Sequence, residues 1–321
     1  MMRSIGGMIS IAVIAVALSA QAAWPQTTRT IRIVVPLPPG GAGDILARQL
    51  GDQLGRVQGP AVVIENRPGA GSVIGTEAVA RAMPDGNTVL MNAPYLLIGP
   101  QVRKVNYDPL TSFEPICYLV SSPGVIVVNS ASPYRTLKDL LAAARTRPGE
   151  LTLASVGPAT AQHIGFEKLK RAAGVNVTYV PYAGGAPAIN ALLGGHVTAV
   201  FAEYAPLAEH LKAGTLRALA TSSRTRIEPL PGLPTVAESG YRDYEVDLWW
   251  GLFAPAKTPK ETVAQLAGWF KAAMQIPEVK AKLVAQGFAP VGLCGAEFGA
   301  LLRRQYDDYA QVIRDANIKG E

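Results

Sequence analysis

The sequence is poor in residues that bind metal ions. Its 321 residues include only two cysteines and three histidines, namely Cys117, Cys294, His163, His196 and His210. Zinc sites place such residues at short, regular spacings, and no two of these five residues stand at one. The sequence therefore predicts no metal site.

Runs of like charge and long apolar segments are also missing. Arginine and lysine are scattered, never more than two together, so the formal net charge of +6 does not indicate a nucleic-acid-binding surface. It indicates a mildly cationic surface that suits anionic ligands. Beyond the N-terminus, no segment approaches the ~20 uninterrupted apolar residues of a membrane-spanning helix. With 49% hydrophobic and 17% charged residues, the composition is that of a folded globular protein.

The N-terminus has the pattern of a secretory signal peptide. Arg3 precedes a mostly apolar stretch, residues 5–18, and Ala20 and Ala22 occupy the small-residue positions of a cleavage site. The apolar stretch is too short to span a membrane, so we expect cleavage after Ala22 and an exported, soluble mature chain in the periplasm. A retained anchor is the alternative. No cysteine stands at the cleavage point, which argues against a lipid anchor.

The two cysteines have two possible states in an oxidising compartment. An even pair there can form a disulfide, which would require the C-terminal region to fold back onto the first domain. Alternatively, Cys117 and Cys294 are two buried small apolar side chains. The sequence leaves both possibilities open.

Short β-rich runs alternate with helical patterns through most of the chain. The run IRIVV, residues 31–35, precedes a helical pattern in which Leu46, Leu50 and Leu54 recur at i, i+4 and i+8. Further runs of this kind are AVVIEN, TVLMN, GVIVVN, LTLAS, VNVTYV, VTAVFA and LRALATS. Such alternation predicts an α/β fold, with parallel or mixed sheets flanked by helices.

The length of the chain allows two domains. Its last third carries two longer amphipathic helices, which suit the outside of a sheet that is already built. We therefore expect the chain to cross between domains near Pro123 and again near Trp249. The predicted division is a signal peptide at 1–22, a first domain at 23–123, a second domain at 124–248, and a return to the first domain at 249–321.

A glycine-rich corner follows the first strand, in the segment PLPPGGAGD that ends at Asp44. It lacks the lysine of a P-loop, and Leu46 stands where a dinucleotide fingerprint requires its third glycine. Glycines let main-chain amides approach a ligand, and the start of a helix carries partial positive charge. The corner is therefore predicted to bind a carboxylate or similar anion through the amides of Gly40 to Gly43. Alternatively, it is only a tight turn with Asp44 as the helix N-cap.

A second corner of the same construction lies in the other half of the chain. A strand ends at Ser155, and Gly157 and Thr160 precede a helix, so two hydroxyl groups add to the amide donors. Ligands of open α/β sheets bind beyond the carboxyl ends of the strands, so we expect the two corners to face each other across a cleft. A hydrogen bond to a charged group contributes ~1.5–3 kcal/mol, so four or five would approach the ~8 kcal/mol of micromolar binding.

A hydrolase is the enzymatic alternative. Ser155 and His163 share one turn and helix, and Glu203 follows a later strand. The segment ASVGP, however, lacks the G-x-S-x-G elbow of such enzymes, which favours a binding protein. Glu203 and Tyr204 are expected at the same end of the sheet as the corners, unless they are a helix-start acid and a surface aromatic.

Nearly all of the chain after the signal peptide resembles the Bug family, the extracytoplasmic solute-binding proteins of tripartite tricarboxylate transporters. The resemblance rests on segments in the family's order, among them IRIVVPLPPGGAGDILAR, VIENRPGAGSVIGTEAVARAMPDGNTVLM, PGELTLASVGPATAQHIGFE, VTYVPYAGGAPAINALLGGHV and WWGLFAPAKTP. It implies a two-domain Venus-flytrap fold of the type II periplasmic-binding class, without catalysis or cofactor. It also implies two partners, a small carboxylate and the membrane subunits of a transporter, for a monomeric protein.

The resemblance further implies the ligand-binding residues. Both corners are expected to grip the carboxylate, partly through ordered water, and the stretches after TVLM and VTYV add contacts. With the residues discussed above, the predicted set is Leu37, Pro39, Gly40, Gly41, Ala42, Gly43, Asp44, Asn92, Ala93, Tyr95, Ser155, Gly157, Ala159, Thr160, His163, Tyr182, Gly184, Gly185, Glu203 and Tyr204.

The chain departs from the family pattern in three places. The stretch at residues 92–95 is bulkier than usual, the second corner has Pro158 and Ala159, and Glu203 stands where aspartate or asparagine is common. We expect these departures to change the part of the site that contacts the distal end of the ligand, and not the contacts with the carboxylate.

Four aromatic residues are candidates for a wall that would suit an aromatic carboxylate. They are Tyr95, Tyr182, Tyr204 and Trp249. Alternatively, most of them are hinge or core residues. For the protein as a whole, a sensor subunit that reports carboxylates to a signalling system is the alternative to a transport receptor.

Overall fold

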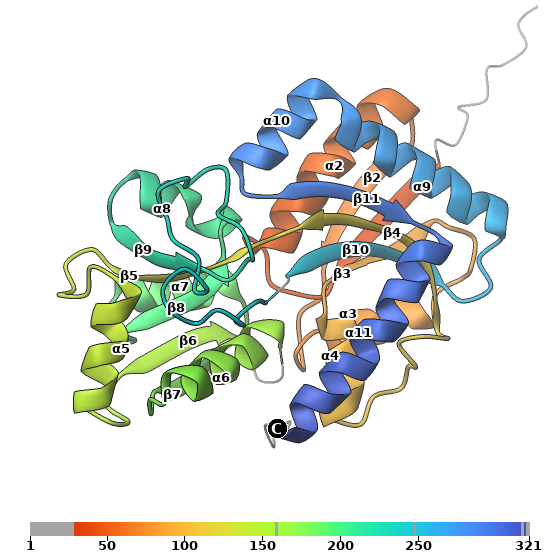
Figure 1. Cartoon of the computed structure of the whole chain (residues 1–321). Coiled ribbons are helices and arrows are strands. Elements are labelled where there is room, and N and C mark those ends of the chain that lie inside the picture. Colours follow the sequence, from red (N-terminus) through yellow and green to blue (C-terminus); the bar gives the residue numbers. More distant parts are fainter. Residues whose placement is uncertain (1–28, 158–159, 247, 316–317, 319–321) are drawn as a thin grey trace, which may run out of the picture.

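The structure is a computed structural model that describes residues 29–157, 160–246, 248–315 and 318. The predicted signal peptide, Pro158 and Ala159 lie outside the described residues. The described chain forms a six-stranded and a five-stranded sheet, each flanked by helices, which we call lobe 1 and lobe 2 (Figure 1). None of the described helices is long and apolar enough to cross a membrane.

The sheet of lobe 1 is mixed, with strand order β11-β4-β10-β3-β1-β2. Strand β1 pairs in parallel with β2 and β3, whereas β10 and β11 both run antiparallel to β4. The C-terminal region therefore adds two strands to the first sheet, and not only the helices that the sequence predicts. The strands are β1 (Thr30–Val35), β2 (Ala61–Asn66), β3 (Thr88–Asn92), β4 (Phe113–Ser121), β10 (Trp249–Pro255) and β11 (Ala289–Cys294).

The sheet of lobe 2 has the order β7-β6-β8-β5-β9. Strand β6 is parallel to β7 and β8, and β5 is antiparallel to β8 and β9. The strands are β5 (Gly124–Asn129), β6 (Thr152–Val156), β7 (Thr178–Tyr182), β8 (Ala199–Glu203) and β9 (Leu216–Thr221). The chain thus enters lobe 2 between β4 and β5, and it rejoins the lobe 1 sheet at β10.

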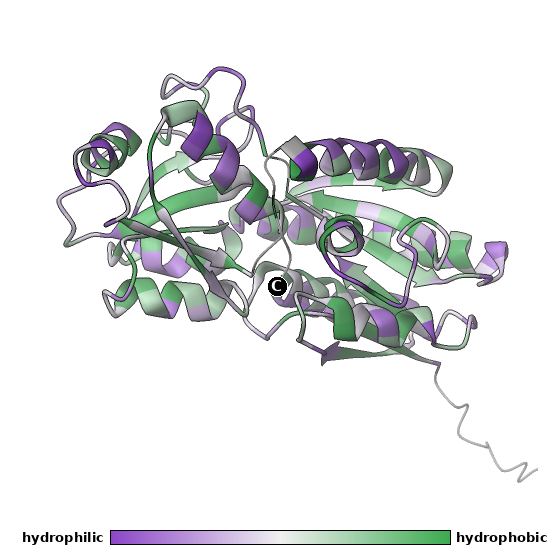
Figure 2. Ribbon diagram, turned by 90° about the horizontal axis from the view of Figure 1, so that it is seen from below, coloured by the Kyte–Doolittle hydropathy of each residue, from purple (hydrophilic) through white to green (hydrophobic). Residues whose placement is uncertain are grey.

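Helices cover both sheets, with hydrophobic residues concentrated in the strands and hydrophilic ones along the outer helices (Figure 2). A capping box of Thr136 and Asp139 starts α5, and Gly59 ends α2 in the left-handed conformation that glycine favours. In lobe 1 the helices are α2 (Ala42–Gln58), α3 (Val73–Ala80), α4 (Tyr95–Val102), α9 (Lys260–Gln275), α10 (Pro277–Ala285) and α11 (Ala296–Asp315). In lobe 2 they are α5 (Leu137–Thr146), α6 (Ala161–Ala173), α7 (Gly185–Leu193) and α8 (Ala208–Lys212), with the 3₁₀ turn η1 (Ala205–Leu207).

The two cysteines form a disulfide within lobe 1. Cys117 of β4 and Cys294 of β11 are register partners in neighbouring antiparallel strands. The C-terminal region therefore folds back onto the first sheet, as a disulfide between these two cysteines requires.

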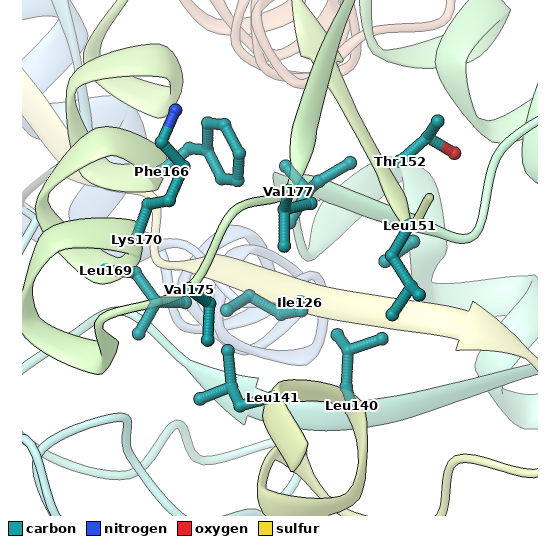
Figure 3. A pocket seen from close by; sticks show the side chains of 12 residues that line it. Ile126, Leu140, Leu141, Leu151, Thr152, Phe166, Leu169, Lys170, Val175 and Val177 are labelled. Atoms are coloured by element: carbon teal, nitrogen blue, oxygen red, sulfur yellow. The ribbon is translucent and has the colours of Figure 1, made fainter. Parts of the chain in front are cut away.

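An apolar cavity of about 20 Å³ lies inside lobe 2, between the sheet and helices α5 and α6 (Figure 3). Ile126, Leu141, Phe166 and Val177 are among its lining side chains. Although one water would fit, a water needs two or more polar partners, so this cavity is a packing gap of the core.

Candidate functional site

The carboxyl ends of parallel strands from both lobes meet at one cavity. Its lining comes from the loops after β1, β2 and β3 in lobe 1 and after β6 and β7 in lobe 2. Five of the described helices, α2, α3, α4, α6 and α7, begin just after these strands. The start of a helix carries partial positive charge and amides without intrahelical acceptors, so this arrangement favours an anionic ligand.

The cavity has a volume of about 240 Å³, and no charged side chain occurs among its described lining residues. Recognition there falls to main-chain groups, hydroxyls and apolar side chains. The described residues also contain no group of three or more His, Cys, Asp or Glu side chains that could hold a metal ion. The lining consists of Leu37, Gly69, Ala70, Gly71, Ser72, Tyr95, Val156, Gly157, Thr160, Pro181, Tyr182 and Ala183.

Five of the predicted binding residues line this cavity: Leu37, Tyr95, Gly157, Thr160 and Tyr182. Gly157 has a φ of 55°, and its N–H donates to the carbonyl of Tyr182 at 2.7 Å. Thr160 is the N-cap of α6, and Tyr95 reaches across to lobe 2. The sequence therefore identified residues from both lobes that the fold brings to one place.

The Tyr95 hydroxyl bridges the lobes by pairing with the Gln162 amide, at 3.0 Å from Nε2 and 3.3 Å from Oε1. Both side chains are buried. Burial, together with the negative charge of Glu203, raises the pKa of Tyr95 well above its ordinary value. The hydroxyl therefore stays protonated, and the contact holds the lobes together beside the cavity.

The glycine-rich corner after β1 is arranged differently from the prediction. The Gly40 N–H donates to Asp44 Oδ2 at 2.9 Å, so one of the amides predicted to bind the ligand, those of Gly40 to Gly43, already has a partner. Burial alone would raise the pKa of Asp44, but hydrogen bonds from Arg48, Gly40 and Asn66 outweigh it and lower that pKa. Asp44 is thus an ionised side chain that holds the corner through Gly40 and Arg48.

Two glycines at or near this corner, Gly43 and Gly184, serve close packing. A Cβ on Gly43 would overlap the indole of Trp250, so α2 can pack on β10 only without a side chain there. A Cβ on Gly184 would lie 3.1 Å from Pro38, which brings the corner of lobe 1 against the start of α7 in lobe 2. The cavity lining includes none of the predicted Pro39, Gly40, Gly41, Ala42, Gly43, Asp44, Gly184 and Gly185.

Asn92 and Ala93 are buried inside lobe 1. Asn92 Nδ2 donates to Thr76 Oγ1 at 3.0 Å, and its Oδ1 accepts from the Ala93 N–H at 2.8 Å. These bonds fix the end of β3, where Tyr95 begins α4. The two residues therefore position the site and do not line it.

Ser155 and His163 both contact Tyr179, which in turn holds the second corner at Gly157. Ser155 Oγ is 3.0 Å from the Tyr179 hydroxyl, which also donates to the Gly157 carbonyl. The His163 ring stacks on Tyr179 at 4.0 Å, and desolvation lowers the pKa of this histidine. Because Ser155 is bonded to a tyrosine and Glu203 lies elsewhere, the hydrolase triad considered above is not assembled.

Glu203 and Tyr204 lie between the lobes, outside the cavity lining. Glu203 is 5% exposed, and its Oε1 accepts from Trp250 Nε1 at 2.8 Å. Burial raises the pKa of Glu203 to about 7, against hydrogen bonds from Trp250 and Ser122 that lower it. Tyr204 packs so closely on Gly287 that a Cβ there would overlap its ring. Both residues therefore join β8 of lobe 2 to lobe 1.

Only half of the proposed aromatic wall faces the cavity. Tyr95 and Tyr182 line it. Trp249 is fully buried, its Nε1 donates to Gln305 at 2.8 Å, and its ring packs on Phe298. With Tyr204 also outside the lining, the core-residue alternative holds for two of the four aromatic residues.

Sequence reasoning missed the loop after β2, residues Gly69 to Ser72, which lines the cavity from lobe 1. All four residues have positive φ, at 136°, 46°, 60° and 81°, although Ala70 and Ser72 are not glycines. Such residues cost ~1–3 kcal/mol each and cluster at functional sites. The signal was present, because RPGAGS is a strand–glycine–helix corner like the two that were recognised.

Comparison with known proteins extends over both lobes. A family model described as "Tripartite tricarboxylate transporter family receptor" matches residues 46–318. Protein BugT of Bordetella pertussis (strain Tohama I / ATCC BAA-589 / NCTC 13251) is 33% identical over 318 residues, 98% of this chain and 97% of BugT. The structure of the periplasmic binding protein BugD is 33% identical, with a TM-score of 0.86, covering 91% of this chain and 99% of BugD. The structure of R. palustris Rpa4515 with adipate is 31% identical, with a TM-score of 0.88, covering 92% and 99% of the two chains.

Proposed function

Because this chain belongs to the tripartite tricarboxylate transporter receptor family, we propose that it is a periplasmic solute-binding protein for a small carboxylate. It captures the carboxylate between its two lobes and delivers it to the membrane subunits of a tripartite tricarboxylate transporter. The observation that carries this proposal is the cavity at which five helices of the described chain begin and whose described lining has no charged side chain.

The relatives support a binding role rather than catalysis. The fold is the two-lobed α/β fold of periplasmic binding proteins, as the sequence predicted. Rpa4515, which superposes over 92% of this chain, was solved with adipate, a carboxylate. In this chain the cavity is lined from both lobes, so lobe closure would remove a ligand there from water.

Calorimetry with matched ligands tests carboxylate binding. We expect at least one acid from a panel of aliphatic and aromatic carboxylates to bind, and its uncharged primary amide to fail, because the helix starts attract negative charge. A ligand at 100 times its dissociation constant should stabilise the folded chain by ~2.7 kcal/mol. Equal binding of an acid and its amide would contradict the proposed carboxylate recognition.

A charged substitution locates the site. Gly157→Asp should lower carboxylate affinity at least ~100-fold, because the added carboxylate repels the ligand and leaves fewer donors for it. Aspartate and asparagine both tolerate the left-handed backbone of Gly157, whose φ is 55°. Gly157→Asn therefore isolates the effect of charge. Gly174→Asp is the matched control, because Gly174 has a φ of 60° at the other end of α6 and lies outside the cavity lining. Equal losses in Gly157→Asp and Gly174→Asp would place the site elsewhere.

Uptake measurements test delivery to the transporter. Cells that lack this chain should stop accumulating the labelled carboxylate, and the wild-type chain should restore uptake. The Gly157→Asp chain should not restore it. Restored uptake by a chain that no longer binds the carboxylate would contradict a receptor role.

A further inference from the structure

The described cavity lining offers a carboxylate one buried, unpaired side-chain donor. Ser72 is 1% exposed, and its Oγ has no hydrogen-bond partner among the described residues. The other buried hydroxyls of the lining are already bonded, Tyr95 to Gln162, and Thr160 to the Gly157 carbonyl and the His163 N–H. A buried hydroxyl without a partner is costly, and because Ser72 also lines the cavity, its hydroxyl is a candidate donor to a ligand there.

Arg103 contacts the loop that carries Ser72. Arg103 Nη1 donates to the Ala70 carbonyl at 2.9 Å, and its guanidinium lies 3.1 Å from where a Cβ on Gly71 would be. The C=O and N–H of a trans peptide point in opposite directions, so the Gly71 N–H points away from Arg103. Gly71 lines the cavity and Arg103 does not, so Arg103 can hold the loop without occupying the site.

The rest of the described lining is mostly apolar. Leu37, Val156, Pro181 and Ala183 are apolar, and the Gly157 N–H is bonded to the Tyr182 carbonyl. A carboxylate placed against such side chains loses its hydration without gaining partners, which is strongly unfavourable. The same surface suits the hydrocarbon part of a ligand.

We propose that the loop Gly69–Ser72 binds the single carboxylate of a monocarboxylate with an apolar body, and that Arg103 positions this loop. The inference rests on the proposed function, since it names the substrate class of the same cavity. It separates this chain from Rpa4515, whose structure holds the dicarboxylate adipate.

Equal-length acid pairs test the substrate class by calorimetry. The pairs are butanoate with succinate, hexanoate with adipate, and benzoate with terephthalate. The deciding pair is the one that contains the tightest-binding acid of the six. In that pair we expect the monocarboxylate to bind at least ~10-fold more tightly than the dicarboxylate, because it buries one charge, which has partners, instead of two. Tighter binding of the dicarboxylate would overturn the inference and leave carboxylate capture standing. Binding of none of the six acids would overturn both.

Substitutions in the loop test the assigned subsite. Ser72→Ala should lower monocarboxylate affinity ~10-fold by removing the hydroxyl donor. Ser72→Gly removes the same donor but relieves a positive φ of 81°, so it should lose as much affinity while gaining stability. Ser132→Ala is the control, because Ser132 Oγ is also buried and unpaired but lies outside the cavity lining. Unchanged affinity in both Ser72 variants would overturn the assignment.

Arg103 is a positioning residue, and its role is tested through coupling. Arg103→Met should lower monocarboxylate affinity in the wild-type chain and much less in the Ser72→Ala chain, because both changes disturb one loop. Arg103→Lys should restore part of the affinity by keeping a donor for the Ala70 carbonyl. A fall in melting temperature with unchanged affinity would reduce Arg103 to a structural residue and overturn this part of the proposal.

Discussion

Removing the Cys117–Cys294 disulfide is expected to lower the free energy of unfolding by as much as about 5 kcal/mol. The bond closes a loop with a sequence separation of 177 residues, and the chain entropy that a cross-link removes from the unfolded state grows with loop length. Both cysteines belong to lobe 1, on β4 and β11, so the loop contains the whole of lobe 2.

Urea unfolding of the Cys117→Ala/Cys294→Ala double variant measures this effect. Wild-type protein unfolded in a reducing agent is the control, because it loses the bond but keeps both side chains. The two samples should agree. A loss below about 1 kcal/mol in both would show that the bond removes little entropy from the unfolded chain, and it would contradict the entropic account. Ligand affinity should not change, since neither cysteine lines the cavity.

The apolar runs predicted most strands, including the edge strands β2, β7 and β9. All seven runs quoted from AVVIEN onward overlap described strands, β2, β3 and β5 to β9. The sequence did not predict β4, β10 or β11. β10 is buried at every residue, and β11 contains Pro290 and Gly292. Neither strand shows the alternation that marks a half-buried strand.

The role of a glycine was harder to predict than its position in a corner. Gly43 and Gly157 both stand in strand–glycine–helix corners, yet Gly43 makes room for an indole and Gly157 lines the cavity. Glycine is required both where another group packs closely against the main chain and where a main-chain amide must be exposed to a ligand. Only the neighbouring residue in the fold distinguishes these two roles. Trp250 is more than 200 residues away from Gly43 in the sequence, so no local pattern could supply it.

The loop Gly69–Ser72 was missed for a different reason. Its left-handed backbone includes Ala70 and Ser72, and non-glycine residues carry no local signal for positive φ. Arg103, which holds the loop, lies beyond α3, β3 and α4 in the chain. The glycines of RPGAGS could therefore have indicated a corner, whereas the positive φ of Ala70 and Ser72 has no local signal.

Replacing Glu203 with glutamine is expected to stabilise the protein by about 3 kcal/mol at pH 8 and hardly at all near pH 4.5. Burial raises the pKa of Glu203 from 4.5 in the unfolded chain to about 7 in the folded one. The stability that follows from this shift is fully present below pH 4.5, is lost as the pH rises from 4.5 through 7, and stays lost above. Glutamine does not titrate, so the variant should keep that stability throughout.

The geometry around Glu203 makes glutamine a conservative change. Its amide oxygen can still accept from Trp250 Nε1, which lies 2.8 Å from Glu203 Oε1. Its NH₂ group can donate to Ser122, whose hydroxyl bonds the carboxyl in the wild-type chain. Trp250→Phe is the opposite control. It removes a donor from a buried carboxylate, so its loss of stability should be larger at pH 8 than at pH 5.

Urea unfolding of the wild-type chain and both variants at pH 5, 6, 7 and 8 gives the profiles. Wild-type and Glu203→Gln curves that run parallel across this range would contradict the assigned titration.

Carboxylate affinity of Glu203→Gln, measured at pH 8, then decides between the two roles considered for this residue. A ligand contact would change affinity when its charge is removed, whereas a link between β8 and β10 outside the cavity should change stability and leave affinity within about twofold. We expect the second result, because the Trp250 indole already occupies the Glu203 carboxyl oxygen that faces lobe 1.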